Sequence, residues 1–298
     1  MKGLTYLLSR RCAQRQHLLR PDKDVEQIYL YCLAEAARRF NVAILGWKVM
    51  SNHHHAVIWD RDGRLSEFLE HLHKLIAKAM NALRDRWENF WAAEKASAVR
   101  LVNAEDRFEK LMYVLMNPVA ADLVDQVADW PGASSFSQML SGKKRVVKRP
   151  SWFFAEDSTM PEQVELAVER PEGFEKLSGA EWSKRVLDEV RKREKAARLE
   201  RQRNDRGVKG RKAVLEGSWK DYPSTAAPRR QLRPEFACKN PKDRAAVAVG
   251  LKEFRRAYRV ALQAWRTGDR SAVFPYGTYA MVVVLGAPCG PPPPLMPN

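Results

Sequence analysis

Short apolar segments rich in β-branched side chains recur in the first half of the chain, and they predict strands. The first spans residues 4–8, and a closely spaced pair covers residues 44–50 and 53–59. A fourth covers residues 98–102. Side chains on a strand alternate between its two faces, so neighbouring residues in these segments should point to opposite sides of a sheet.

Apolar positions three and four residues apart predict helices between and after these strands. The helices should cover residues 24–40, 66–86 and 103–118. We expect the last helix to stop at Pro118, because a proline disfavours helical backbone angles in the residue before it. The order of elements indicates an α+β fold, in which helices cover one face of an antiparallel sheet and the other face is open.

The second half begins at a basic segment, residues 141–157, that we interpret as a linker lying on phosphates. Residues 158–200 have a helical pattern, residues 201–235 resemble a loop rich in Arg, Lys and Gly, and an apolar stripe predicts a helix over residues 241–265. The predicted organisation is a first domain (1–140), the linker (141–157), a basic and mostly helical accessory region (158–290) and a disordered proline-rich tail (291–298).

Charge is distributed unevenly between the two halves. Residues 1–140 carry 19 Lys and Arg against 17 Asp and Glu, whereas residues 141–298 carry 33 against 19. A basic surplus of this size favours a polyanionic partner, because each neutralised phosphate releases counterions. A solvated helix of mixed charge is the alternative for part of the second half.

Cysteine usage and hydropathy indicate the compartment. The four cysteines, Cys12, Cys32, Cys238 and Cys289, form no Cys-x-x-Cys pair, so we expect no zinc site or disulfide framework. The first residues contain too short an apolar run for a signal peptide, and no segment is long enough to span a bilayer. We therefore expect a cytoplasmic protein with no membrane partner.

Three adjacent histidines stand on the third predicted strand. Because strand side chains alternate, His53 and His55 share one face and can converge on one divalent cation, while His54 points the other way. Adjacent histidines also occur at strand ends without a metal. On the predicted helix over residues 103–118, Tyr113 and Asn117 are four residues apart and share a face. The tyrosine can act as a nucleophile and the asparagine as a third, oxygen ligand, although buried tyrosine rings are common in ordinary cores.

The order of strand, Asn-His-x-His, amphipathic helix and Tyr-x-x-x-Asn-Pro-Val resembles the single-tyrosine HUH transposases, most of all the REP-associated branch. The resemblance covers residues 1–140 and includes the Trp130–Ser135 segment. One departure is His54, where the family usually has a bulky hydrophobic residue. We expect His54 to pack under a helix as a neutral imidazole.

The resemblance implies a ferredoxin- or RRM-like fold and a DNA strand-transfer reaction. His53, His55 and Asn117 would bind Mg²⁺ or Mn²⁺, and Tyr113 would form a 5′-phosphotyrosine with single-stranded DNA beside a hairpin. A homodimer is left open. The basic residues expected to contact phosphates are Arg10, Arg11 and Arg15 in the first loop and Lys143, Lys144 and Arg145 in the linker.

Two other functions stay open from the sequence. A degenerate member of the same fold would bind nucleic acid without turnover. In a hydrolytic metal-dependent nuclease, water would attack the phosphate and Tyr113 would be structural.

Overall fold

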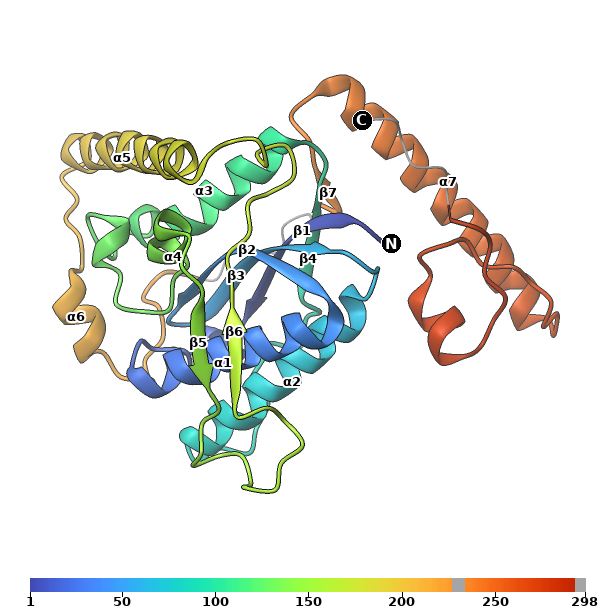
Figure 1. Ribbon diagram of the computed structural model, residues 1–298, viewed down its shortest axis with the longest axis horizontal. Coiled ribbons are helices and arrows are strands. Elements are labelled where there is room, and N and C mark those ends of the chain that lie inside the picture. Colours follow the sequence, from blue (N-terminus) through green and yellow to red (C-terminus); the bar gives the residue numbers. More distant parts are fainter. Residues whose placement is uncertain (227–233, 293–298) are drawn as a thin grey trace.

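A five-stranded sheet forms the centre of the computed structural model, which describes residues 1–226 and 234–292 (Figure 1). The strand order is β2-β3-β1-β4-β7. The first four strands pair antiparallel, and the short β7 adds a parallel edge beside β4. The predicted α+β class is confirmed, with a mixed sheet. The strands are β1 (Leu4–Arg11), β2 (Val42–Met50), β3 (His53–Asp60), β4 (Ser97–Leu101) and β7 (Phe236–Ala237).

The helices begin and end close to the predicted residues in the first half of the chain. Asp22 caps the first helix by accepting a hydrogen bond from the Val25 N–H at 2.8 Å, and Asn41 ends it in the left-handed conformation. The helices are α1 (Lys23–Phe40), α2 (Leu65–Leu83), α3 (Ala104–Ala120), α4 (Phe136–Ser141), α5 (Gly179–Arg203), α6 (Arg211–Glu216) and α7 (Pro241–Arg266).

Helices cover both faces of the sheet, so the prediction of one open face was wrong. Helices α1 and α2 pack on the face that carries Leu8 and Ile58, which we call the α1 face. Helix α3 packs on the opposite face against Leu7 and Val57, which we call the α3 face. Both sets of strand side chains are apolar, and each buried side chain of this size contributes about 1.5–3 kcal/mol. Both faces therefore need a covering layer.

Helix α3 continues to Ala120, two residues beyond the predicted end. Its first turn is fixed by Asp106, whose carboxylate accepts a hydrogen bond from the Asn103 N–H at 3.2 Å. Pro118 removes one backbone donor, but Pro118 and Val119 are both buried in the core on this face. Burial of these two residues keeps the last turn helical.

The segment expected to be a linker contains a strand instead. Strand β5 (Arg145–Lys148) pairs antiparallel with β6 (Gln163–Leu166), and this hairpin packs on the α1 side of the molecule through Val147 and Leu166. The helical pattern expected over residues 158–200 is confirmed only from the start of α5. The predicted helix at residues 241–265 is α7. Residues 227–233 and 293–298, the latter most of the proline-rich tail, lie outside the described residues.

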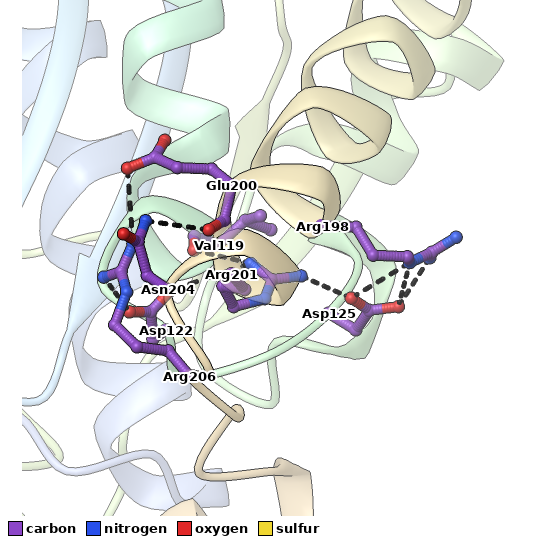
Figure 2. A network of polar contacts seen from close by, with 8 residues as sticks. All are labelled: Val119, Asp122, Asp125, Arg198, Glu200, Arg201, Asn204 and Arg206. Atoms are coloured by element: carbon purple, nitrogen blue, oxygen red, sulfur yellow. Dashed lines mark hydrogen bonds and ion pairs between the residues drawn. The ribbon is translucent and has the colours of Figure 1, made fainter.

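Helix α5 is joined firmly to α3. Trp182, Val186 and Val190 pack into the core on the α3 face. At the far end of α5 the buried Arg201 donates a hydrogen bond to the Val119 carbonyl at 3.5 Å and forms ion pairs with Asp122 and Asp125 (Figure 2). The same two aspartates also bind further arginines of this segment, Arg198 and Arg206. Helix α5 thus supports the helix that carries Tyr113.

No helix among residues 1–226 and 234–292 is both long and apolar enough to cross a membrane.

Candidate active site

Strand β3 separates the three histidines as the alternation predicted. His53 and His55 lie on the α3 face, with their ring centroids 4.9 Å apart and their planes at 81°. His54 lies on the α1 face and is fully buried. The two outer histidines are therefore close enough to converge on one ion, while the middle one is directed into the opposite core.

Helix α3 brings Tyr113 and Asn117 over the two outer histidines. The Tyr113 ring centroid lies 5.5 Å from that of His55, and 45% of the Tyr113 side chain is exposed. Asn117, one turn later, lies close enough to His53 to raise its pKa slightly against the effect of burial. The Lys110 ammonium lies 5.6 Å from the centre of the Tyr113 ring and adds positive charge there. A strand and a helix 60 residues apart in sequence thus place an accessible phenol beside a pair of imidazoles.

Asn52 fixes the orientation of His53, a role that sequence reasoning missed. The Asn52 amide donates to the Arg15 carbonyl at 3.0 Å, so its oxygen faces the His53 Nδ1 at 2.7 Å. This oxygen can only accept, so we assign the proton to Nδ1. The His53 Nε2 lone pair is then directed away from Asn52, which is how a metal-binding imidazole is usually oriented. The sequence signal for Asn52 was its place as the asparagine of the Asn-His-x-His motif.

Both outer histidines are held in the neutral form that can bind a metal. Burial is the main cause that lowers the pKa of His53 to about 4, and nearby Arg11 and Arg15 act in the same direction. Burial also lowers the pKa of His55. The His55 Nδ1 is buried and has no hydrogen-bond partner among the described residues. An unpartnered ring nitrogen in a buried site is what a ligating imidazole presents before an ion binds.

The donor set fits a divalent ion with open coordination positions. Two imidazole nitrogens and one amide oxygen would occupy three positions and leave others for phosphate oxygens or water. The described part of the chain contains no group of three His, Cys, Asp or Glu residues that could hold a metal. The candidate site therefore depends on Asn117 as its third donor.

The α1 face holds His54 without an open nitrogen. The His54 Nδ1 lies 3.1 Å from the Tyr29 hydroxyl on α1, and its Nε2 lies 3.1 Å from the His73 Nε2 on α2. Burial lowers the pKa of His54 to about 3. As expected, His54 is a neutral core residue packed under helices.

A buried lysine is a second feature that the sequence did not indicate. Lys48 pairs with His55 across β2 and β3, so it shares the α3 face, and its side chain is fully buried. Its ammonium has no hydrogen-bond partner among the described residues. Burial lowers the pKa of Lys48 to about 7. Lysine is rarely buried without a partner, so the sequence of this strand gave no reason to expect that Lys48 is buried.

The predicted phosphate contacts of the first loop divide between the two faces. Arg11 is opposite His53 and lies 3.6 Å from Glu94, while Arg15 donates to the Thr225 carbonyl at 2.6 Å. Both lie near enough to affect the pKa of His53. Arg10 is opposite His54 and its guanidinium lies over the Trp91 ring at 5.3 Å, on the α1 face. Arg11 and Arg15 are therefore the two that border the candidate site.

The basic residues expected in the linker are placed away from the candidate site, around the hairpin on the α1 side. Lys144 forms an ion pair with Glu165 at 2.7 Å, and Arg145 forms one with Glu26 of α1 at 2.8 Å. Lys143 is exposed in the turn before β5. DNA binding by these three residues stays a prediction.

No protein-family profile and no curated protein matches the chain. Among solved structures, the chain is similar to a REP-associated tyrosine transposase bound to a REP hairpin, with 19% sequence identity and a TM-score of 0.41, over 60% of this chain and 94% of that one. It is also similar to a candidate transposase from Deinococcus radiodurans R1, with 16% identity and a TM-score of 0.30, over 38% of this chain and 90% of that one. At these values the function has to be inferred from the side chains of the site.

Proposed function

We propose that this chain is a metal-dependent transposase that cleaves and rejoins single-stranded DNA beside hairpins through a 5′-phosphotyrosine. One observation carries the proposal. An exposed tyrosine, Tyr113, lies beside two neutral histidines whose ring nitrogens can converge, and Asn117 completes the group from the same helix. The arrangement combines a nucleophile with a site for a divalent ion, which is what covalent phosphoryl transfer requires.

His53, His55 and Asn117 would hold Mg²⁺ or Mn²⁺. When bound, such an ion supplies Lewis acidity at a phosphate oxygen and fixes the phosphate in place. Asn52 keeps the ligating nitrogen of His53 directed into the site through the contact at 2.7 Å. Burial of both histidines keeps them unprotonated, because charging them inside the protein is costly.

Tyr113 performs the chemical step. Its Oη gives up its proton to water and attacks phosphorus, a new O–P bond forms, and the bond to the 3′ oxygen breaks in line with it. The 5′ side stays attached to the tyrosine, and the other strand leaves with a free 3′-OH after that oxygen takes up a proton. Attack by a 3′-OH on the phosphotyrosine reverses the step, so the energy of the bond is conserved and DNA can be rejoined without ATP.

A single nucleophile is available on the helix. Tyr113 is the one tyrosine of α3. Each active site can therefore hold one DNA strand covalently at a time. This supports a single-tyrosine enzyme rather than a two-tyrosine relative.

Single-stranded DNA next to a hairpin is the substrate to test first, because the sequence motifs resemble those of the REP-associated branch. The exposed edge of Tyr113 and the adjacent Arg11 and Arg15 provide a place where one strand can approach the site. Contacts to phosphates position a strand without selecting a sequence.

A denaturing gel tests this function. Wild-type protein, Tyr113→Phe and Tyr222→Phe are incubated with Mn²⁺ and labelled single-stranded hairpin oligonucleotides. Tyr222 is the matched control, because the residue is 51% exposed and its hydroxyl donates to the Gln14 side chain, not to the histidines. We expect a retarded protein–DNA band in wild type and Tyr222→Phe that is absent in Tyr113→Phe.

Two other outcomes would contradict the proposal. Cleavage without an adduct, undiminished in Tyr113→Phe, would identify a hydrolytic nuclease. Hairpin binding with neither cleavage nor adduct, over a panel of flanking sequences, would identify a degenerate binding protein.

A further inference from the structure

Helix α7 carries a row of cations along one side. Successive residues of a helix are about 100° apart, and six basic residues of α7 fall within an arc of about 120°. The two acidic residues of α7, Asp243 and Glu253, lie outside this arc. All six basic residues are exposed. We call this set the basic stripe; it consists of Arg244, Lys252, Arg255, Arg256, Arg259 and Arg266.

Packing does not require the basic stripe. A different side of α7 carries Tyr258, Ala261 and Trp265, which pack against Phe274 and Met281 of the following segment. Within residues 1–226 and 234–292, Arg255 is the one member of the basic stripe with an ion pair, to Glu235. Helix α5 differs, because its basic residues form many ion pairs with acidic neighbours.

We propose that the basic stripe binds the phosphate backbone of duplex DNA. The stripe extends from Arg244 to Arg266, about 33 Å at the rise of an α-helix. This length matches about one turn of B-DNA, which is 34–36 Å. The inference rests on the proposed function in taking DNA as the polyanion, and it assigns the paired stem of a hairpin to α7.

Duplex DNA fits the stripe better than a single strand. Proteins that bind single strands combine positive charge with aromatic rings on which bases stack. The aromatic residues of α7 are stacked on each other or turned toward Phe274, as the pair Phe254 and Tyr258 shows with ring centroids 6.5 Å apart. The basic stripe itself has no aromatic member. A straight row of cations without a stacking surface suits regularly spaced phosphates on a stiff helix.

The position of α7 separates this binding surface from the cleavage site. Helix α7 follows β7, which pairs with Arg100 and Leu101 at the end of β4. The other end of β4, at Ser97, is the end nearest to Arg11 and His53. Figure 1 shows α7 to one side of the sheet and its covering helices, with the segment that follows α7 folded along it. Substitutions in the stripe should therefore change affinity for the stem and leave the chemical step at saturating DNA unchanged.

The test is the salt dependence of duplex binding by the full chain in metal-free buffer with EDTA. Fluorescence anisotropy follows a labelled 20-base-pair duplex of arbitrary sequence over a range of KCl concentrations. The variant changes Lys252, Arg256, Arg259 and Arg266 to Gln. The matched control removes the same charge from exposed positions of α5, with Lys184, Arg191, Lys192 and Lys195 changed to Gln.

We expect the stripe variant to lower the slope of log Kobs against log salt by about 3–4, since each B-DNA phosphate contact contributes about 0.9. Its duplex affinity at low salt should fall at least about tenfold, whereas the α5 control should keep both values. The single change Arg256→Gln should lower the slope by about 1, which keeps the test valid if the quadruple variant unfolds.

Three results would overturn the inference: an equal loss in the α5 control, an unchanged slope in the stripe variants, or a loss confined to single-stranded DNA or to duplex RNA. Binding is measured without metal, so it is independent of cleavage. Duplex binding through the stripe with no Tyr113 adduct would contradict the proposed function alone. A Tyr113 adduct together with an unchanged salt slope in the stripe variants would contradict this inference alone.

Discussion

Histidine side chains on the two faces of strand β3 differ in the hydrogen-bond partners of their ring nitrogens. On the α1 face, His54 is fully buried and both of its ring nitrogens have protein partners, Tyr29 and His73. On the α3 face, the His55 Nδ1 has no partner among the described residues. Burial lowers the pKa of both histidines, so burial alone does not distinguish them. The difference lies in the unpartnered nitrogen and in the exposed tyrosine beside it.

Buried polar atoms without a hydrogen-bond partner among the described residues lie on both faces of the sheet, for example the His73 Nδ1 on the α1 face and the His55 Nδ1 on the α3 face. The Lys48 ammonium is a further buried group of this kind, on the α3 face. A buried polar atom without a partner costs about 1–3 kcal/mol. The protein tolerates this cost on both faces, and His54 differs from His55 because its Nδ1 contacts the Tyr29 hydroxyl. Four substitutions can break or sharpen this contrast.

Removing a ligand on the α3 face should have the largest effect. His55→Gln keeps most of the side-chain volume but replaces a good metal ligand with a poor one. In the proposed mechanism a bound metal would contribute several kcal/mol to the transition state, so we expect DNA cleavage to fall by about 10³-fold. Single-turnover cleavage at several Mn²⁺ concentrations checks this. Cleavage within threefold of wild type would mean that His55 is not a ligand.

Removing the residue that orients His53 should have an intermediate effect. Asn52→Ala deletes the acceptor at 2.7 Å from the His53 Nδ1 and leaves the ring free to rotate. Groups that orient a metal ligand typically contribute 10–100-fold in affinity, and we expect Mn²⁺ to bind about that much more weakly. Titration calorimetry measures the Kd. An unchanged Kd would show that Asn52 has no part in metal binding.

Disturbing the α1 face should affect stability alone. Tyr29→Phe removes only the hydroxyl that contacts the His54 Nδ1 at 3.1 Å and leaves that nitrogen buried without a partner. We expect the free energy of unfolding to fall by about 1–3 kcal/mol, with the cleavage rate at saturating Mn²⁺ unchanged. Urea denaturation and single-turnover cleavage on the same sample check the two parts. A loss of cleavage in the folded variant would contradict the separation of the faces.

Filling the Lys48 site with an apolar side chain should stabilise the fold without affecting the proposed chemistry directly, by an amount that depends on pH. Burial lowers the pKa of Lys48 to about 7, below the value near 10.4 of an unfolded chain. Between these values the unfolded state binds the proton and the folded state does not, so this contribution to stability rises with pH. The penalty is complete below pH 7.

Lys48→Met should therefore stabilise the fold by about 1–3 kcal/mol at pH 7, with a smaller gain at pH 9. Urea denaturation at both pH values measures the change. A gain that grows with pH would mean that Lys48 has a partner in the folded protein.

Much of the first half could be predicted from the sequence because its patterns are local. Alternation on β3 placed His53 and His55 together, and the i, i+4 spacing placed Tyr113 and Asn117 on one face of α3. The apolar stripe of α7 likewise gave the predicted helix. These features depend on backbone geometry alone, which a sequence pattern reflects directly.

Features set by tertiary contacts could not be predicted. The second covered face depends on α3 crossing the sheet, and the extension of α3 past Pro118 depends on burial of Val119 in that core. Strand β6 has only four residues, too few for alternation to be distinguished from a helix within residues 158–200. The orientation of Asn52 and the burial of Lys48 are set by groups that lie far away in sequence. For Asn52 this group is the Arg15 carbonyl.

Anomalous diffraction from crystals of the full chain grown with Mn²⁺ tests the central claim most directly. The claim is that the α3 face of β3 holds a divalent ion beside Tyr113 and the α1 face holds none. We predict one anomalous peak bounded by His53, His55 and Asn117. A peak between His54 and His73, or no peak beside His53 and His55 at saturating Mn²⁺, would contradict the account.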